Sequence, residues 1–169
     1  MNKQEIMHLL NDTRQEFVHL RTNGQVKLPF IPGSQMSVQF DPSNISINEV
    51  ADAVGAISAR RIGRQKEAEK ALFRSCMQSF EDCEEDFETP QKQLDWEAEQ
   101  TAAFDAPKVP KRRRDIWKLV RFTTIQVEIS TDPAPLSGTI VSLFAECAWD
   151  GEHGVALHYT SGKRLIKAG

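Results

Sequence analysis

The last third of the chain carries the hydrophobic pattern that most constrains its fold. Between residues 124 and 130, Ile125, Val127 and Ile129 alternate with polar residues, which is typical of a half-buried strand. The next apolar run, TIVSLFAEC, is hydrophobic on both faces and predicts a central strand. GVALHY, the turn TSGK and RLIKA then predict a closing hairpin. Residues 115–169 therefore predict an antiparallel β-meander.

The first 105 residues are dominated by helical spacing. Apolar residues recur at steps of three and four over residues 3–21, 64–87 and 92–104, which predicts three helices. Ser46 and Glu49 have the spacing of a capping box, so another helix is expected to begin just after Ser46. A short strand is expected in the sequence MSVQF. Together these elements predict an α+β fold in which N-terminal helices pack on the C-terminal antiparallel β-meander.

The length of 169 residues allows one domain with a core but is short for two. We expect a single domain over residues 1–169, with a helical part at about 1–105, a basic linker at 106–114 and a β-rich part at 115–169. The basic residues of the linker have no interleaved aromatic residues. They are therefore expected to neutralise nearby acidic charge or to keep the linker soluble.

Composition excludes several classes of partner. The formal net charge of -3 gives no general reason to expect nucleic-acid binding. We expect no membrane partner either, because no run of about 18 apolar residues is present and the N-terminal residues do not resemble a signal peptide. Three cysteines without a CxxC pair favour reduced thiols, and hence a cytoplasmic protein without zinc or another cofactor.

The segment ECAWDGEHGV, residues 146–155, is the densest group of chemically active residues. Asp150, Glu152 and His153 lie within four positions and are possible metal ligands. Glu152 and His153 are also a possible general acid–base pair. Cys147 and His153 form a possible nucleophilic pair, although Cys147 ends an apolar strand and is expected to be buried. No recognisable metal motif accompanies these residues.

A structural interpretation of the same segment is favoured. Asp150 and Gly151 are expected to form a tight turn between two strands. Gly154 is expected to supply an unusual backbone conformation, which glycine adopts without steric cost. Trp149 is expected to fill a pocket in the core. No catalytic residue and no metal ligand are therefore assigned.

A second concentration of charge lies in EDCEEDFE, residues 81–88. Its six acidic residues are Glu81, Asp82, Glu84, Glu85, Asp86 and Glu88. A charge run of this kind is usually a solvated helix face, but it is also suited to binding the basic cleft of a partner protein. We regard these six residues as the candidate partner-binding surface.

The C-terminal residues SLFAECAWDGEHGVALHYTSGKRLIKAG resemble a bacterial family of unknown function. The family signature, Cys-x-Trp-Asp-x-Glu-His-Gly, lies between an apolar strand and a glycine-containing hairpin. The matching positions are Cys147, Trp149, Asp150, Glu152, His153, Gly154 and Gly162. The family often has a further glycine after Gly154, where this chain has Val155 and Ala156. The resemblance covers about residues 115–169, and the N-terminal half is similar in organisation only.

Related families include immunity proteins of toxin systems, so the resemblance implies toxin binding and supplies no catalytic residues. The leading expectation is a cytoplasmic immunity-type protein that binds a cognate toxin or effector and occludes its active site. Acidic side chains of residues 81–88, together with the turn at 149–153, would cover that site. The alternatives are a metal-dependent hydrolase centred on the 149–153 turn and a non-catalytic adaptor or structural module.

Overall fold

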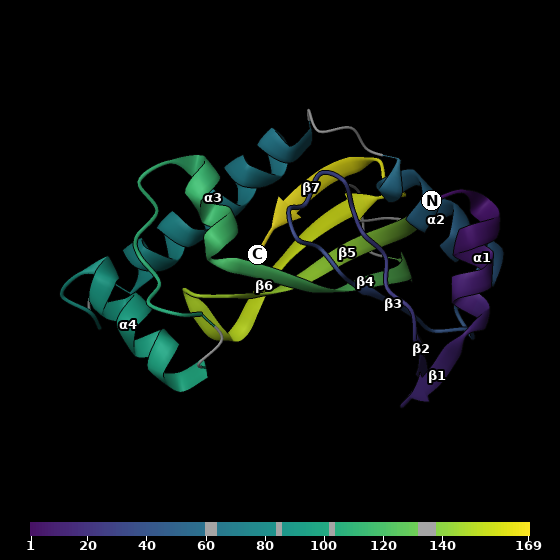
Figure 1. The fold of residues 1–169 in the computed structure, drawn as a ribbon, viewed down its shortest axis with the longest axis horizontal. Coiled ribbons are helices and arrows are strands. Elements are labelled where there is room, and N and C mark those ends of the chain that lie inside the picture. The colour runs from purple at the N-terminus through teal and green to yellow at the C-terminus, as the bar shows by residue number, and fades with distance from the viewer. Residues whose placement is uncertain (60–63, 84–85, 102–103, 132–137) are drawn as a thin grey trace.

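The computed structural model describes residues 1–59, 64–83, 86–101, 104–131 and 138–169. Its central element is a sheet whose seven described strands lie side by side in chain order (Figure 1). The strands are β1 (Thr13–Glu16), β2 (His19–Thr22), β3 (Ser37–Phe40), β4 (Val120–Ser130), β5 (Gly138–Cys147), β6 (Asp150–Thr160) and β7 (Arg164–Ala168). The helices are α1 (Lys3–Asn11), α2 (Ile47–Ser58), α3 (Gln65–Asp82), α4 (Pro90–Thr101) and the 3-10 helix η2 (Arg113–Lys118).

The sheet is mixed, so the prediction of a purely antiparallel meander is wrong. β3 runs parallel to β4, with Ser37 opposite Thr124 and Phe40 opposite Val127. The other neighbouring pairs of described strands are antiparallel. The chain between β3 and β4 contains α2, α3, α4 and η2, and a parallel pair requires a long crossover of this kind. The expected antiparallel hairpins among β4, β5, β6 and β7 are confirmed.

The predicted helix over residues 3–21 is wrong in its second half. α1 ends at Asn11, and the chain then forms the hairpin of β1 and β2. β2 also pairs with β3, and Arg21 donates a hydrogen bond from Nε to Ser37 Oγ over 2.7 Å. This pairing with a distant strand outweighs the local helical spacing, because strand preference depends strongly on such neighbours.

The other helices follow local signals more closely. α2 begins where its capping box predicts: Ser46 Oγ accepts a hydrogen bond from the Glu49 backbone, and the Glu49 carboxylate accepts one from the Ser46 backbone. α3 ends at Asp82, before the end predicted at residue 87. α4 begins at Pro90, in the first helical turn, where proline has no intrahelical hydrogen bond to lose. None of the described helices combines the length and apolar composition needed to cross a membrane.

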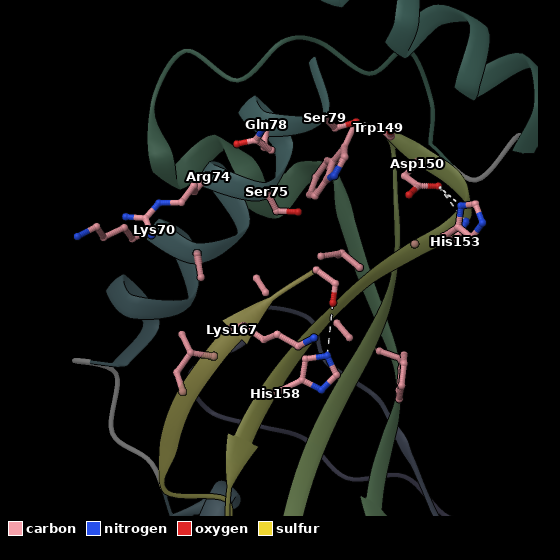
Figure 2. Close-up of a pocket in the computed structure, with 18 of the residues that line it drawn as sticks. Lys70, Arg74, Ser75, Gln78, Ser79, Trp149, Asp150, His153, His158 and Lys167 are labelled. Carbon is pink, nitrogen blue, oxygen red and sulfur yellow. Dashed lines mark hydrogen bonds and ion pairs between the residues drawn. The ribbon is translucent and has the colours of Figure 1, made fainter. Parts of the chain in front are cut away.

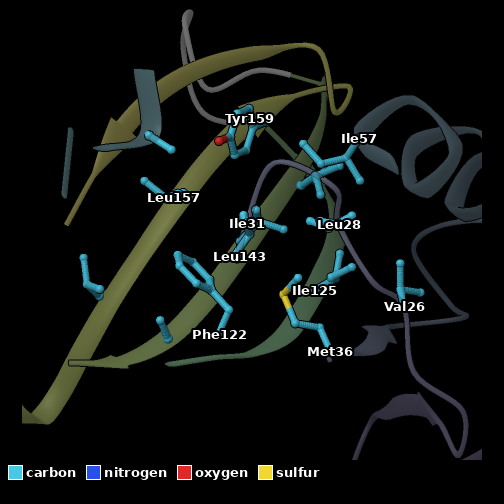
Figure 3. Close-up of a cluster of buried hydrophobic side chains, with 14 of the residues drawn as sticks. Val26, Leu28, Ile31, Met36, Ile57, Phe122, Ile125, Leu143, Leu157 and Tyr159 are labelled. Atoms are coloured by element: carbon cyan, nitrogen blue, oxygen red, sulfur yellow. The ribbon is translucent and has the colours of Figure 1, made fainter. Parts of the chain in front are cut away.

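The main core lies against one face of the sheet (Figure 3). Ile125, Leu143 and Leu157 lie opposite one another on β4, β5 and β6, and all three are fully buried. The side chains that cover them come from residues 26–36 and from α2, and include Leu28, Ile31, Met36 and Ile57. The alternation predicted for β4 is therefore confirmed at its centre.

The predicted basic linker packs along α4. Pro107 and Pro110 are buried, whereas the lysines and arginines of residues 106–114 are exposed. Gln91 of α4 donates a hydrogen bond to the Pro107 carbonyl over 2.9 Å and accepts one from the Val109 backbone over 3.3 Å. The segment thus contributes two prolines to the interior and places its charges in solvent.

Candidate functional site

The ECAWDGEHGV segment connects β5 to β6 at one end of the sheet (Figure 2). Cys147 lies opposite Asp150, so the two-residue turn is Ala148–Trp149 rather than the predicted Asp150–Gly151. Trp149 retains only 2% of its surface exposed, and its ring lies beside α3. The prediction that Trp149 is a core residue is confirmed, while the turn lies earlier in the chain than predicted.

Two helices hold this turn by direct hydrogen bonds. The Trp149 carbonyl accepts one from Ser79 Oγ of α3 over 3.3 Å and one from Gln93 Nε2 of α4 over 3.2 Å. The Gly151 backbone donates to Glu97 Oε2 of α4 over 2.9 Å. The sequence pattern did not indicate Ser79, Gln93 or Glu97, because each lies 54 to 70 residues from its partner in the chain.

The residues after the turn form a compact loop within β6. Asp150 Oδ1 accepts a hydrogen bond from the His153 backbone over 2.9 Å and lies 3.2 Å from His153 Nδ1. Gly154 has a φ of 70°, and a Cβ at this position would lie 2.4 Å from the Ala145 carbonyl oxygen. The predicted need for glycine is therefore confirmed, with close approach of β5 as its cause.

The reactive groups near the turn do not form an assembled catalytic set. Burial raises the pKa of Cys147 and of neighbouring Cys76 to about 12, so both thiols stay protonated at neutral pH. Cys147 Sγ donates to the Asp150 carbonyl over 3.4 Å rather than facing His153. Within the described part of the chain, no three His, Cys, Asp or Glu side chains are arranged to hold a metal ion.

A serine–histidine pair lies farther along the same strands. Ser142 Oγ and His158 Nδ1, which lie opposite each other on β5 and β6, are hydrogen-bonded at 2.8 Å. Burial lowers the pKa of His158 below its ordinary value, which favours the neutral ring. Because Ser142 is only 1% exposed, its hydroxyl is not placed to attack a substrate.

The acidic segment 81–88 is distributed over the end of α3 and the connection to α4. Glu81 and Asp82 belong to α3, Asp86 and Glu88 lie in the connection, and Glu84 and Glu85 fall outside the described residues. Among the described acidic residues of the segment, only Glu81 and Asp82 therefore lie on a helix. Glu88 forms an ion pair with Lys92.

Carboxylates from three parts of the chain act on the thiol of Cys83, which follows α3. Burial raises the pKa of the Cys83 thiol, and the charges of Asp86, Asp82, Glu97 and Asp150 raise it further. The charges of these four carboxylates all act on the Cys83 thiol, and we refer to the four residues as the acidic cluster. Among the described residues, no ion pair neutralises Asp82 or Asp86.

A groove of about 870 Å³ lies beside the cluster, between α3 and the strands β6 and β7 (Figure 2). Phe144 and Leu165 contribute apolar surface to it, and Trp149, which is almost fully buried, also borders it. Lys70 and Arg74 of α3 and Lys167 of β7 add positive charge, and Asp82 and Asp150 of the acidic cluster also line it. Groups of both charges therefore surround the β5–β6 turn, which α3 and α4 hold by hydrogen bonds.

A family model described as a domain of unknown function (DUF6985) matches residues 9–169. The match includes α3, α4 and the β5–β6 turn, so all four residues of the acidic cluster lie inside the family domain. No curated protein and no solved structure matches the chain.

Proposed function

Since the chain belongs to the DUF6985 family of domains of unknown function, we propose its function from its own site: it is a cytoplasmic immunity-type protein that binds a bacterial toxin and occludes the toxin's active site. The observation that supports this proposal most is the acidic cluster, in which two carboxylates have no neutralising partner among the described residues. The resemblance of the C-terminal residues to a family related to immunity proteins supports it as well.

The physical basis of the proposed binding is charge complementarity. Enzymes that act on nucleic acids or nucleotides need basic clefts, and an acidic surface attracts such a cleft over a distance of about one Debye length, roughly 8–10 Å. The carboxylates of Glu97 and Asp150 are held by hydrogen bonds from Gly151 and His153. Little conformational entropy would therefore be lost when a partner binds them.

The direct test is coexpression of this chain with the product of the adjacent gene. We expect the chain to relieve the toxicity of that product and to copurify with it as a stable complex. The proposal fails if the product is not toxic, or if it remains toxic and no complex forms.

Two matched double variants test whether the acidic cluster is the toxin-binding surface. Asp82→Lys combined with Asp86→Lys should slow association with the toxin by at least about 10-fold at low salt, because steering depends on these charges. Asp105→Lys combined with Glu128→Lys makes the same change in net charge at exposed positions outside the cluster, and should have little effect. Equal association rates for the two double variants would show that the acidic cluster is not part of the interface.

Two other results would point to the alternative functions. Stoichiometric zinc or manganese in the purified protein, lost in His153→Ala, would favour a metal-dependent hydrolase at residues 149–153. A stable partner without toxicity would favour an adaptor module. Elemental analysis and complementation with the adjacent gene therefore separate the three functions.

A further inference from the structure

The β1 strand forms one edge of the sheet, and β2 is its only strand neighbour among the described residues. Figure 1 shows the hairpin of β1 and β2 projecting beyond α1. The opposite edge differs, because β7 contacts α3. An open edge carries unpaired backbone N–H and C=O groups, which can form hydrogen bonds with a strand of another molecule.

The residues at the tip of this hairpin are energetically unfavourable for an isolated chain. Phe17 is 97% exposed and Val18 is 63% exposed, although both side chains are apolar. Phe17 also has a φ of 56°, in the first central position of a two-residue turn where glycine is usual. A bulky aromatic residue at such a position combines backbone strain with exposed apolar surface. This combination is typical of a residue that is buried in a contact.

We propose that β1 pairs with β1 of a second copy of this chain, antiparallel and centred on Gln15. Glu16 and His19 flank the two-residue turn, so they form a hydrogen-bonded pair of the hairpin. Backbone groups alternate in direction along a strand, and those of Gln15 therefore point away from β2. Two Gln15 residues related by a two-fold axis then exchange a pair of backbone hydrogen bonds.

The charges of β1 are self-complementary in this register. Arg14 lies opposite Glu16 of the second copy, and the symmetry repeats this contact. The two residues share one face of the strand and are already paired within one chain, where Arg14 Nη2 lies 3.0 Å from Glu16 Oε1. Charged residues on an edge strand usually prevent pairing, but in this order they favour one register over its neighbours.

The same register accounts for the exposed tip. Phe17 lies opposite Thr13 of the second copy, so its ring is covered on association. The inference is independent of the proposed function, because Figure 1 shows α4 and the hairpin at opposite ends of the molecule. A dimer formed through β1 would leave both acidic clusters accessible.

The test is sedimentation equilibrium of the full chain, from about 1 μM to about 1 mM, since a short strand interface is expected to be of moderate affinity. We expect a monomer–dimer equilibrium, weakened at least 10-fold by Arg14→Glu and likewise by Glu16→Arg. An equimolar mixture of the two variants should form a heterodimer, because both contacts between positions 14 and 16 then join one acidic and one basic side chain. A wild-type monomer throughout the range, or no association in the mixture, overturns the proposal.

A third variant separates association from folding. Phe17→Gly removes the apolar ring and suits the positive φ of the turn, so the monomer should unfold at the same temperature or higher. Its dimerisation should still weaken at least 10-fold. A dimer that survives Phe17→Gly and both charge reversals forms through another surface, and that result also overturns the proposal.

Discussion

Gly154 and Gly33 have nearly the same backbone conformation, with φ values of 70° and 69°, but different surroundings. A Cβ at Gly154 would meet the Ala145 carbonyl, whereas a Cβ at Gly33 has no heavy atom within 4 Å. We therefore expect Gly154→Ala to lower the free energy of unfolding by about 2–4 kcal/mol and Gly33→Ala by about 1 kcal/mol. Urea denaturation measures both. Equal losses would show that backbone conformation alone, and not the approach of β5, requires glycine.

His158 makes stability depend on pH. Burial lowers its pKa in the folded protein below the ordinary value of 6.5, so the unfolded chain takes up the proton first as the pH falls. The stabilisation from the neutral ring is complete above pH 6.5 and is lost as the pH falls from 6.5 towards the lower folded pKa.

Chemical denaturation at about pH 7.5 and about pH 5.5 tests this dependence. The wild-type protein should lose more stability between these pH values than His158→Gln does, because the variant has no proton to bind at this position. The same loss in both proteins would assign the pH dependence to other groups.

Among the elements, α3 and α4 both bind the β5–β6 turn through the Trp149 carbonyl, and α4 binds it also through Glu97. Ser79 and Gln93 both donate to the Trp149 carbonyl, and Gln93 is only 2% exposed. Gln93→Met should cost about 1–3 kcal/mol, because its donor is lost from a buried position.

A double-mutant cycle tests whether the two donors act together. Gln93 Nε2 also lies 3.2 Å from Ser79 Oγ, so all three groups form one network. We expect the effects of Gln93→Met and Ser79→Ala to differ from additivity by at least about 0.5 kcal/mol. Additive effects would mean that α3 and α4 hold the turn independently.

Elements set by neighbouring residues were predictable, and elements set by distant contacts were not. Ser46 and Glu49 mark the start of α2 correctly because a capping box involves only residues three apart. The hairpin of β1 and β2 was missed because its second strand pairs with β3, which local spacing does not reveal. The β5–β6 turn was placed too late because Trp149 occupies a turn position while its side chain is buried against α3.

In the candidate site, too, features set by neighbouring residues were predictable and features set by distant contacts were not. The acidic residues of 81–88 and the signature residues were visible as two separate patterns in the sequence. That Asp82, Asp86 and Asp150 act on the same thiol, Cys83, together with Glu97, depends on how α3 and α4 pack against β6. Sequence spacing carries no information on that packing, so Glu97 had no distinguishing signal.

For the molecule as a whole, stability should decrease from the centre of the sheet towards β1. β4 and β5 are long, have a neighbour on each side and carry much of the core. Hydrogen exchange in dilute protein should therefore be slowest in β4 and β5 and fastest, among the strands, in β1. Protection of β1 equal to that of β5 in the monomer would show that the sheet opens as one unit.

The parallel pairing of β3 with β4 has a consequence for synthesis on the ribosome. Residues 37–40 find their partners only at residues 124–127, about 90 positions later. At about 5–20 residues per second, a nascent chain waits on the order of 10 s for that partner. Until then β3 has one open side, and the N-terminal half cannot complete its sheet. Aggregation during translation therefore depends on how well the open side of β3 is protected from pairing with other chains during that interval.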